Sequence, residues 1–357
     1  MKKKTIITIL ILFIIIFLII FGIFNISKNN NLNNELEDTI VNKENETIEE
    51  KIDETENVEK NNFVSYNGWL RIENNILVNE NGEPFRLKGI STHGLQWYSK
   101  FANKEMMKNL KEKLDINLFR IAMYTEENGY INNPSLIDKV EEIVEYAKEL
   151  DMYVIIDWHI LSDGDPLKHK EEAKIFFEKM SQKYKNYPNV IYEICNEPNG
   201  NVTWEGNIKP YAEEVISVIR KNSKDSIIIV GTPTWSQEVD KPANNKINDK
   251  NTMYALHFYS ASHGEWLRER TTEALKSIPI FVSEWGVSDV FGNGIIDKEE
   301  TLKWVEFMNN NNLSYAVWSL SDKNESSALL ITGASINNFN DDNLSEAGKL
   351  IKDLINE

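Results

Sequence analysis

Two glutamates in this chain stand where a pair of carboxylates could do chemistry. Glu197 lies in an Asn-Glu-Pro tripeptide at the end of one expected strand, and Glu284 lies in a Ser-Glu-Trp-Gly stretch at the end of a later one. Carboxylates at the carboxyl ends of different strands can meet across a site at the top of a barrel. Such a pair can serve as the acid and the nucleophile that break a glycosidic bond.

The elements that must position this pair alternate regularly from Phe63 onward. A hairpin comes first, and Asn81-Gly82 signals its turn between two apolar stretches, residues 76–78 and 85–87. Short apolar strands and helical patterns then alternate to the C-terminus. We expect eight strands, which end near Ser91, Tyr124, His159, Glu197, Thr232, Tyr259, Glu284 and Trp318.

This alternation predicts an α/β protein, a (β/α)8 TIM barrel with a short N-terminal β-hairpin. The clearest helix begins at Pro134-Ser135, and the last helix covers residues 344–355. Residues 63–357 have the length of one barrel and leave no segment for a second folded domain. A doubly wound open sheet is the weaker alternative, because no glycine-rich phosphate loop follows the first strand.

Polar and aromatic side chains gather at the expected strand ends, where a barrel builds its site. Arg120 and Tyr259 near Glu284 would favour its ionised form. That charge would in turn keep Glu197 protonated and ready to act as an acid. Glu193 would point the same way deeper in the barrel, where we expect a paired core carboxylate. The full set at the strand ends is Arg120, His159, Asn196, Glu197, His257, Tyr259, Glu284 and Trp318.

Seven ordered segments carry a resemblance to a known family. They are residues 87–97, 119–124, 156–159, 196–198, 257–259, 283–286 and 318–323. In these segments the chain resembles glycoside hydrolase family 5, and most closely its bacterial endo-β-1,4-glucanases. The resemblance implies a retaining cellulase that cuts internal β-1,4 bonds, with Glu197 as acid/base and Glu284 as nucleophile. It further implies support from Arg120, His159, Asn196, His257, Tyr259 and Trp318, and a non-proline cis peptide after Trp318.

The resemblance also implies a set of substrate-binding residues around the cleavage point. Indole and phenol rings can stack on the apolar faces of sugars. Asn196 is expected to hydrogen-bond the sugar 2-hydroxyl, a contact that strengthens in the transition state. The substrate-binding positions are His93, Trp97, Tyr124, Trp235, His263, Lys323 and Glu325.

Two other functions stay open at this point. Related barrels cut mannan, xylan or mixed-linkage β-glucan with the same two glutamates. A protein of another class would be a catalytically inactive, membrane-tethered glycan-binding protein. The presence of both glutamates, Asn196 and Tyr259 argues against a dead site.

Composition limits the cofactors and partners. His159 and His257 lack the close helical spacing of a metalloprotease pair, and no cluster of Cys or carboxylates completes a site around them, so we expect no metal and no cofactor. The single cysteine, Cys195, lies in an apolar strand and is expected to be inert core. A formal charge of -17 argues against nucleic acid as a partner. We expect a monomer that binds β-glucan polysaccharide.

The N-terminus has a different character from the rest of the chain. Three lysines precede an Ile/Leu/Phe-rich run over residues 5–24, which could span a bilayer as a helix of roughly 20 residues. No small-residue cleavage site follows, which favours an uncleaved anchor (residues 1–24) over a secretory signal peptide. Residues 25–62 are Asn/Glu-rich and predict a disordered acidic linker. We therefore expect the barrel at the extracellular face of the membrane, or secreted if the segment is cleaved.

Overall fold

The computed structural model describes residues 63–355. The expected membrane anchor (residues 1–24) and acidic linker (residues 25–62) lie outside the described residues. Within the part of the chain that is described, no helix combines the length and the apolar character needed to cross a bilayer.

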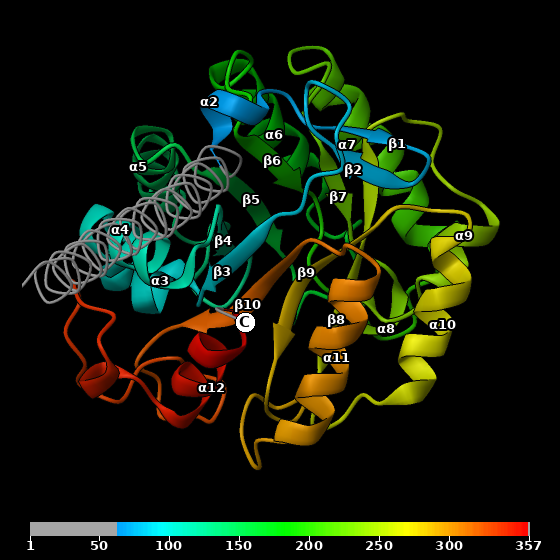
Figure 1. The fold of residues 1–357 in the computed structure, drawn as a ribbon. Helices are drawn as coiled ribbons and strands as arrows, with labels where there is room; N and C mark the ends of the chain where they lie inside the picture. Colours follow the sequence, from blue (N-terminus) through cyan, green and yellow to red (C-terminus); the bar gives the residue numbers. More distant parts are fainter. Residues whose placement is uncertain (1–62, 356–357) are drawn as a thin grey trace, which may run out of the picture. The chain divides into compact units, whose positions relative to one another are not determined.

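Eight strands close into a barrel, and each is parallel to both of its neighbours (Figure 1). Their order around the barrel follows the sequence, and β10 closes the ring by pairing with β3. The (β/α)8 fold is thereby confirmed. The strands are β3 (Lys88–Thr92), β4 (Leu118–Tyr124), β5 (Tyr153–His159), β6 (Val190–Glu193), β7 (Ile228–Val230), β8 (Thr252–Tyr259), β9 (Ile280–Gly286) and β10 (Tyr315–Leu320).

Helices surround the barrel on its outside (Figure 1). The helix expected from Pro134-Ser135 begins at Leu136, and the last helix begins at Glu346. The α-helices are α2 (Val64–Asn67), α3 (Leu95–Tyr98), α4 (Lys104–Leu114), α5 (Leu136–Glu149), α6 (Lys170–Lys183), α7 (Lys209–Arg220), α8 (Pro233–Ser236), α9 (Asp240–Asn244), α10 (Glu265–Leu275), α11 (Lys298–Asn310) and α12 (Glu346–Ile355). Short 3-10 turns cover Ser99–Phe101 and Asp341–Asn343, and a π-helical turn covers Trp204–Ile208.

The strands divide the apolar core into two layers. Along β5, Tyr153 and Ile155 join the cluster inside the barrel, whereas Val154 and Ile156 join the cluster beneath the helices. This alternation is the period of two that a strand imposes on its side chains. Because Ile155 faces the inside of the barrel, Asp157 and His159 on the same strand face inward too, toward the carboxyl end of the barrel. Cys195 lies buried and unpaired.

The hairpin is confirmed, but its turn is not where the sequence predicted it. β1 (Arg71–Glu73) pairs antiparallel with β2 (Ile76–Val78) across Asn74-Asn75, where both residues have positive φ. The expected partner strand at residues 85–87 is absent from the described chain. The turn at Asn81-Gly82 leads only to an isolated bridge between Val78 and Pro84. Two Asn residues tolerate the left-handed conformation well enough to make the earlier, tighter turn.

Two strands also end earlier than expected. β6 ends at Glu193 rather than at Glu197, and β7 ends at Val230 rather than at Thr232. The chain leaves the sheet before Asn196, although the Asn196 amide still donates to Trp158 O at 3.2 Å. Pro198 has no amide hydrogen and cannot continue a ladder. Glu197 therefore lies on a loop at the mouth of the barrel.

Candidate active site

A cavity of about 570 Å³ opens at the carboxyl ends of the barrel strands and collects most of the expected site residues. Both glutamates line it. Arg120 and Asn196 lie beneath it, fully buried, and Trp97 stands beside Tyr124 with ring centroids 5.1 Å apart. The expected residues that line the cavity are His93, Tyr124, His159, Glu197, Trp235, His257, Tyr259, His263, Glu284, Trp318, Lys323 and Glu325.

Glu284 is turned into the cavity by a bulge in β9. The pairing with β8 steps from Ala255↔Phe281 to His257↔Glu284, so β9 has one extra residue at this point. Its pairing with β10 shifts in the same stretch. A bulge kinks a strand and re-aims its side chains. The sequence, read as a regular strand, does not predict it.

Two donors hold the Glu284 carboxylate. The Tyr259 hydroxyl donates to Oε1 at 2.7 Å, and Arg120 Nη1 donates to Oε2 at 3.2 Å. Burial, together with the charge of Glu284, raises the pKa of Tyr259 well above its ordinary value, so the phenol keeps its proton and donates it. The two carboxylate oxygens of Glu284 are thereby fixed in orientation.

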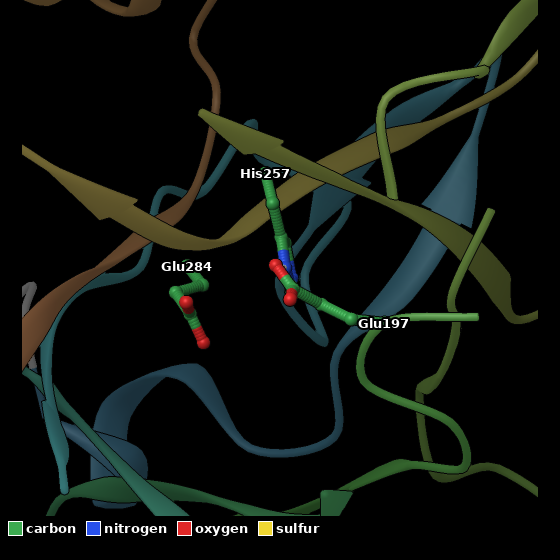
Figure 2. Close-up of side chains that lie close together, drawn as sticks. All are labelled: Glu197, His257 and Glu284. Atoms are coloured by element: carbon green, nitrogen blue, oxygen red, sulfur yellow. The ribbon is translucent and has the colours of Figure 1, made fainter. Parts of the chain in front are cut away.

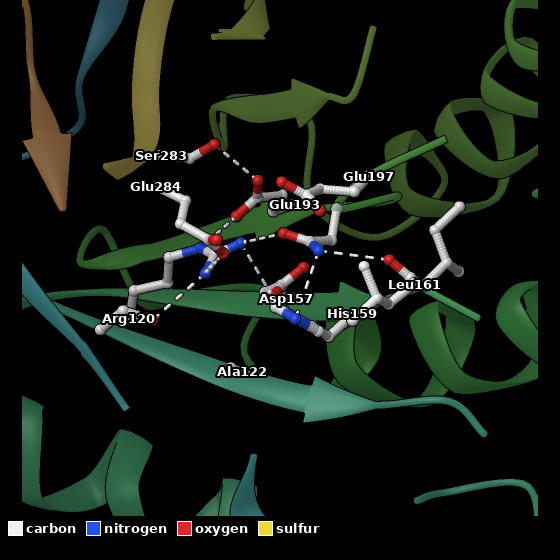
Figure 3. Close-up of polar contacts among 12 residues, drawn as sticks. Arg120, Ala122, Asp157, His159, Leu161, Glu193, Glu197, Ser283 and Glu284 are labelled. Atoms are coloured by element: carbon white, nitrogen blue, oxygen red, sulfur yellow. Dashed lines mark hydrogen bonds and ion pairs between the residues drawn. The ribbon is translucent and has the colours of Figure 1, made fainter. Parts of the chain in front are cut away.

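Arg120, on β4, is the centre of the buried polar network (Figure 3). Its Nε donates to Glu193 at 2.7 Å, and its Nη2 lies 3.0 Å from Asp157. Burial alone would lower the pKa of Arg120, but the carboxylates of Asp157, Glu193 and Glu284 raise it above the ordinary value. In Glu193, burial raises the pKa, and Arg120 overcomes that effect and brings it down to about 2. Glu193 is thus the paired core carboxylate that the sequence indicated.

Glu197 lies across the cavity from Glu284 and has different neighbours. The residue is 8 % exposed, and its Oε1 lies 3.0 Å from His257 Nδ1. Burial raises the pKa of Glu197 to about 7. The charge of Glu284 raises it too, while the hydrogen bond with His257 works against both. A carboxyl group with such a pKa still carries its proton in mildly acidic solution.

His257 is held on both sides. The Ser283 hydroxyl donates to Glu193 Oε1 at 2.6 Å, so its oxygen accepts from His257 Nε2 at 2.9 Å. Burial lowers the pKa of His257, but hydrogen bonds to Glu193 and Glu197 outweigh it and raise the pKa to about 9. His257 is therefore a donor to Glu197 at neutral pH.

Glu197, His257 and Glu284 form a tight cluster (Figure 2). Each offers one possible metal-ligand atom, and these atoms lie within 4.8 Å of one another. The expectation that no carboxylate cluster surrounds His257 is wrong in this respect, because loops and a bulge bring together residues that are far apart in sequence. A cation here would face the fixed charge of Arg120, 3.2 Å from Glu284. We interpret the cluster as two carboxyl groups with a histidine that donates to one of them, rather than as a metal centre.

His159 and Asn196 form the floor beside Arg120. His159 Nδ1 lies 2.6 Å from Asp157 Oδ2, and its Nε2 lies 3.2 Å from Asn196 Nδ2. Burial and then the Arg120 charge lower the pKa of His159 to about 3, so the ring is neutral. Arg120 Nη2 donates to Asn196 Oδ1 at 2.6 Å, which fixes the amide so that its Nδ2 donates to the neutral His159. Asp157 was missed from the sequence, although it shares the parity of His159 in Ile-Ile-Asp-Trp-His.

One end of the cavity carries a polar trio beside aromatic rings. Lys323 Nζ lies 2.6 Å from Glu325 Oε2 and 3.3 Å from His93 Nε2. Burial, with the Lys323 charge, lowers the pKa of His93 to about 3. Trp97 keeps 43 % of its surface exposed. The Trp318–Ser319 peptide is cis, as the resemblance implied.

The other end carries Trp235 and His263. Trp235 is 44 % exposed and sits in a run of three residues with positive φ, Thr234 to Ser236. His263 Nδ1 accepts from the Tyr259 amide at 2.9 Å, and burial lowers the pKa of His263 to about 4. The neutral ring therefore carries its proton on Nε2.

Six cavity residues were not anticipated from the sequence: Leu161, Thr234, Gln237, Val290, Phe291 and Gly292. Five lie on loops after strand ends and Thr234 lies in the short segment α8, where spacing carries little information about side-chain direction. The one available signal was the apolar pair Val290-Phe291 in the loop after a strand end, and it is a weak one because Ile295-Ile296 lies in the same loop.

Comparisons with known proteins agree with this architecture. The family model described as Cellulase (glycosyl hydrolase family 5) matches residues 78–324. The chain is 52% identical over 294 residues to "Endoglucanase 5" of Pectobacterium carotovorum subsp. carotovorum, covering 82% of this chain and 58% of that protein. It is 53% identical over 279 residues to "Endoglucanase A" of Evansella cellulosilytica, covering 77% of this chain and 57% of that protein. The chain thus spans less than two thirds of the length of these curated relatives.

Solved structures of cellulases are also similar to this chain. The catalytic domain of Thermobifida fusca endoglucanase Cel5A, solved with cellotetraose, superposes with a TM-score of 0.80 at 34% identity, covering 82% of this chain and 99% of that one. The cellulase Cel5C_n superposes with a TM-score of 0.79 at 40% identity, covering 82% and 94% of the two chains. The fold, the ordered segments and these matches agree, and this chain belongs to glycosyl hydrolase family 5.

Proposed function

We propose that this chain is a retaining endo-β-1,4-glucanase that hydrolyses internal bonds of cellulose and related β-glucans. One observation carries the proposal: carboxylate oxygens of Glu197 and Glu284 lie within 4.8 Å of each other. Retaining enzymes separate their carboxyl groups by about 5–5.5 Å, whereas inverting enzymes need about 6.5–9.5 Å to admit a water. The endoglucanase names of the relatives, and the cellotetraose in one neighbour, support β-1,4-glucan as the substrate.

The first step forms a glycosyl-enzyme. Glu284, oriented by Tyr259 and Arg120, attacks the anomeric carbon, while Glu197 gives its proton to the departing glycosidic oxygen. The raised pKa of Glu197, about 7, keeps that proton available.

The second step reverses the role of Glu197. Once Glu284 is an ester, the negative charge that helped to raise the pKa of Glu197 is gone. Glu197 then loses its proton more readily and accepts one from the incoming water. Water attacks the ester and releases a sugar with retained configuration.

The remaining residues bind the chain around the cleavage point. We assign Asn196, which Arg120 holds in place, to the 2-hydroxyl of the reacting sugar, and neutral His159 supports its amide. His257 orients Glu197, and Trp318 lines the same cavity. We assign sugar binding to His93, Trp97, Tyr124, Trp235, His263, Lys323 and Glu325.

Reducing-sugar release tests the proposal. Residues 63–357 are assayed on carboxymethylcellulose, barley β-glucan, glucomannan, galactomannan and xylan, with Glu284→Gln as the matched inactive variant. Strong activity on the first two that is lost in the variant supports a β-1,4-glucanase. Activity confined to a mannan or to xylan keeps the mechanism and rejects the substrate. Binding without turnover on any polymer rejects catalysis.

We also propose that the enzyme works as a monomer at the extracellular face of the membrane. The support is in the sequence: Lys2 to Lys4 precede a long apolar run over residues 5–24 without a small-residue cleavage site.

A further inference from the structure

The loop between β9 and α11 carries an aromatic residue, Phe291, that lines the cavity but is not among the sugar-binding residues assigned above. Phe291 is 85 % exposed, and it lines the same cavity as Glu284. Its neighbour Val290 is 45 % exposed and also lines the cavity. A large apolar side chain left in solvent at the edge of a binding cavity indicates a contact made only when ligand is bound.

The loop that carries Phe291 is held from within. Asp289 Oδ1 accepts from the amides of Phe291 at 2.9 Å and of Asn293 at 3.2 Å. The Asp289 carbonyl accepts from the Gly292 amide at 3.0 Å. One carboxylate and one carbonyl thus close a tight turn with Phe291 at its tip.

The loop is also fixed to the cavity wall on both sides. The Val290 amide donates to Ser262 Oγ at 3.1 Å, next to His263. On the other side, Gly292 O accepts from the Ser327 amide at 3.0 Å. Gly292 has φ +72°, a conformation that favours glycine, and a Cβ there would lie only 3.0 Å from Ser327 Oγ. Phe291 is therefore held between the two ends of the cavity and not on a free loop.

We propose that Phe291 is a further substrate-binding residue, a platform for one glucosyl ring of the bound chain outside the two rings that flank the broken bond. The inference rests on the proposed function, because only a glucan chain longer than the cleavage site reaches the loop. The axial C–H groups of a pyranose present an apolar face that packs on an aromatic ring. The ordering cost is small, because the loop is already fixed.

The test compares Phe291→Ala with Ile295→Ala in the full chain. Ile295 belongs to the same loop and is 73 % exposed, but it does not line the cavity. The values of kcat and KM are measured on cellotriose, cellotetraose, cellopentaose and cellohexaose. We expect Phe291→Ala to lower kcat/KM on the longer oligosaccharides by about two- to tenfold through KM, with the shortest unchanged. Phe291→Trp, which keeps an aromatic ring at this position, retains the wild-type kcat/KM, and so does Ile295→Ala.

Two outcomes overturn the inference, and they are distinguishable. If wild type hydrolyses the series and Phe291→Ala keeps the wild-type KM at every length, the platform is absent while the proposed function stands. If wild type hydrolyses none of the oligosaccharides, the proposed function fails first and the platform fails with it.

Discussion

Glu197 and Glu284 carry the same carboxyl group but have different neighbours. Glu284 accepts from a phenol and a guanidinium, at 2.7 and 3.2 Å. Glu197 is buried against His257, and burial raises its pKa to about 7. The proposed division of labour follows from these contacts, because the raised pKa of Glu197 keeps the proton that an acid needs.

The raised pKa of Glu197 predicts a pH dependence of kcat/KM. Above about pH 7, Glu197 loses the proton that the leaving group needs, so kcat/KM on β-glucan falls with rising pH. The profile is measured on barley β-glucan between mildly acidic and alkaline pH.

A matched variant identifies the group responsible. In Glu197→Gln, an aryl cellobioside whose phenol leaves without protonation still forms the glycosyl-enzyme, and the alkaline fall of that step disappears. A fall that persists in the variant assigns the pH dependence to another group.

Removing the charge of Arg120 should cost stability as well as activity. Arg120→Met leaves Asp157, Glu193 and Glu284 buried around a missing cation, since Arg120 is fully buried. Loss of one partner of a buried ionic network costs about 3–5 kcal/mol of unfolding free energy. Urea unfolding checks this, with Lys276→Met as control, since its surface pair with Glu273 is worth at most about 1 kcal/mol. Equal losses in the two variants contradict the role given to Arg120.

At the scale of elements, the left-handed turn at Thr234–Ser236 bonds to the backbone on both sides of Glu197. The Trp235 amide donates to Pro198 O at 3.0 Å, and Ser236 Oγ donates to Asn196 O at 2.7 Å. Three consecutive non-glycine residues with positive φ are costly, at about 1–2 kcal/mol each. We infer that this turn positions Glu197 from both sides.

Ser236→Ala tests that positioning role. The Ser236 hydroxyl donates to Asn196 O and accepts from the Thr232 amide. Losing these buried hydrogen bonds, worth about 1 kcal/mol each, should lower kcat by about fivefold or more, with KM little changed. Thr272→Ala is the control, because its hydroxyl bonds only within its own helix. Steady-state kinetics on carboxymethylcellulose measure both variants. If Ser236→Ala changes KM instead of kcat, Ser236 positions the sugar-binding Trp235 and not Glu197.

Regular elements could be predicted from the sequence, and the departures from regularity could not. Alternation along β5 and β8 predicted which side of each strand faces the cavity, so His159, His257 and Tyr259 were found. The bulge in β9 has no local sequence signature, because it is defined by how β9 pairs with β8 and β10. Glu197 was placed on a strand, since neither periodicity nor composition reveals where a chain leaves a sheet. Phe291 was missed because loop geometry decides its direction.

At the scale of the whole molecule, the barrel is closed on itself. Its strands pair in a ring, so the described part of the sheet has no open edge. Every residue that we assign to the site lies between His93 and Glu325. The catalytic body should therefore work independently of residues 1–62, which we propose serve only to hold it at the membrane.

Comparing the full chain with residues 63–357 tests that separation. We expect equal kcat/KM on soluble barley β-glucan, because the site uses no residue before Phe63. We expect different locations: the full chain stays in the membrane pellet after an alkaline carbonate wash, which strips peripheral proteins but not a spanning helix. On this proposal the three lysines keep the N-terminus inside, so external protease should release the active barrel from intact cells. Finding the enzyme free in the medium without residues 1–24 would instead mean that the apolar run is a cleaved signal peptide.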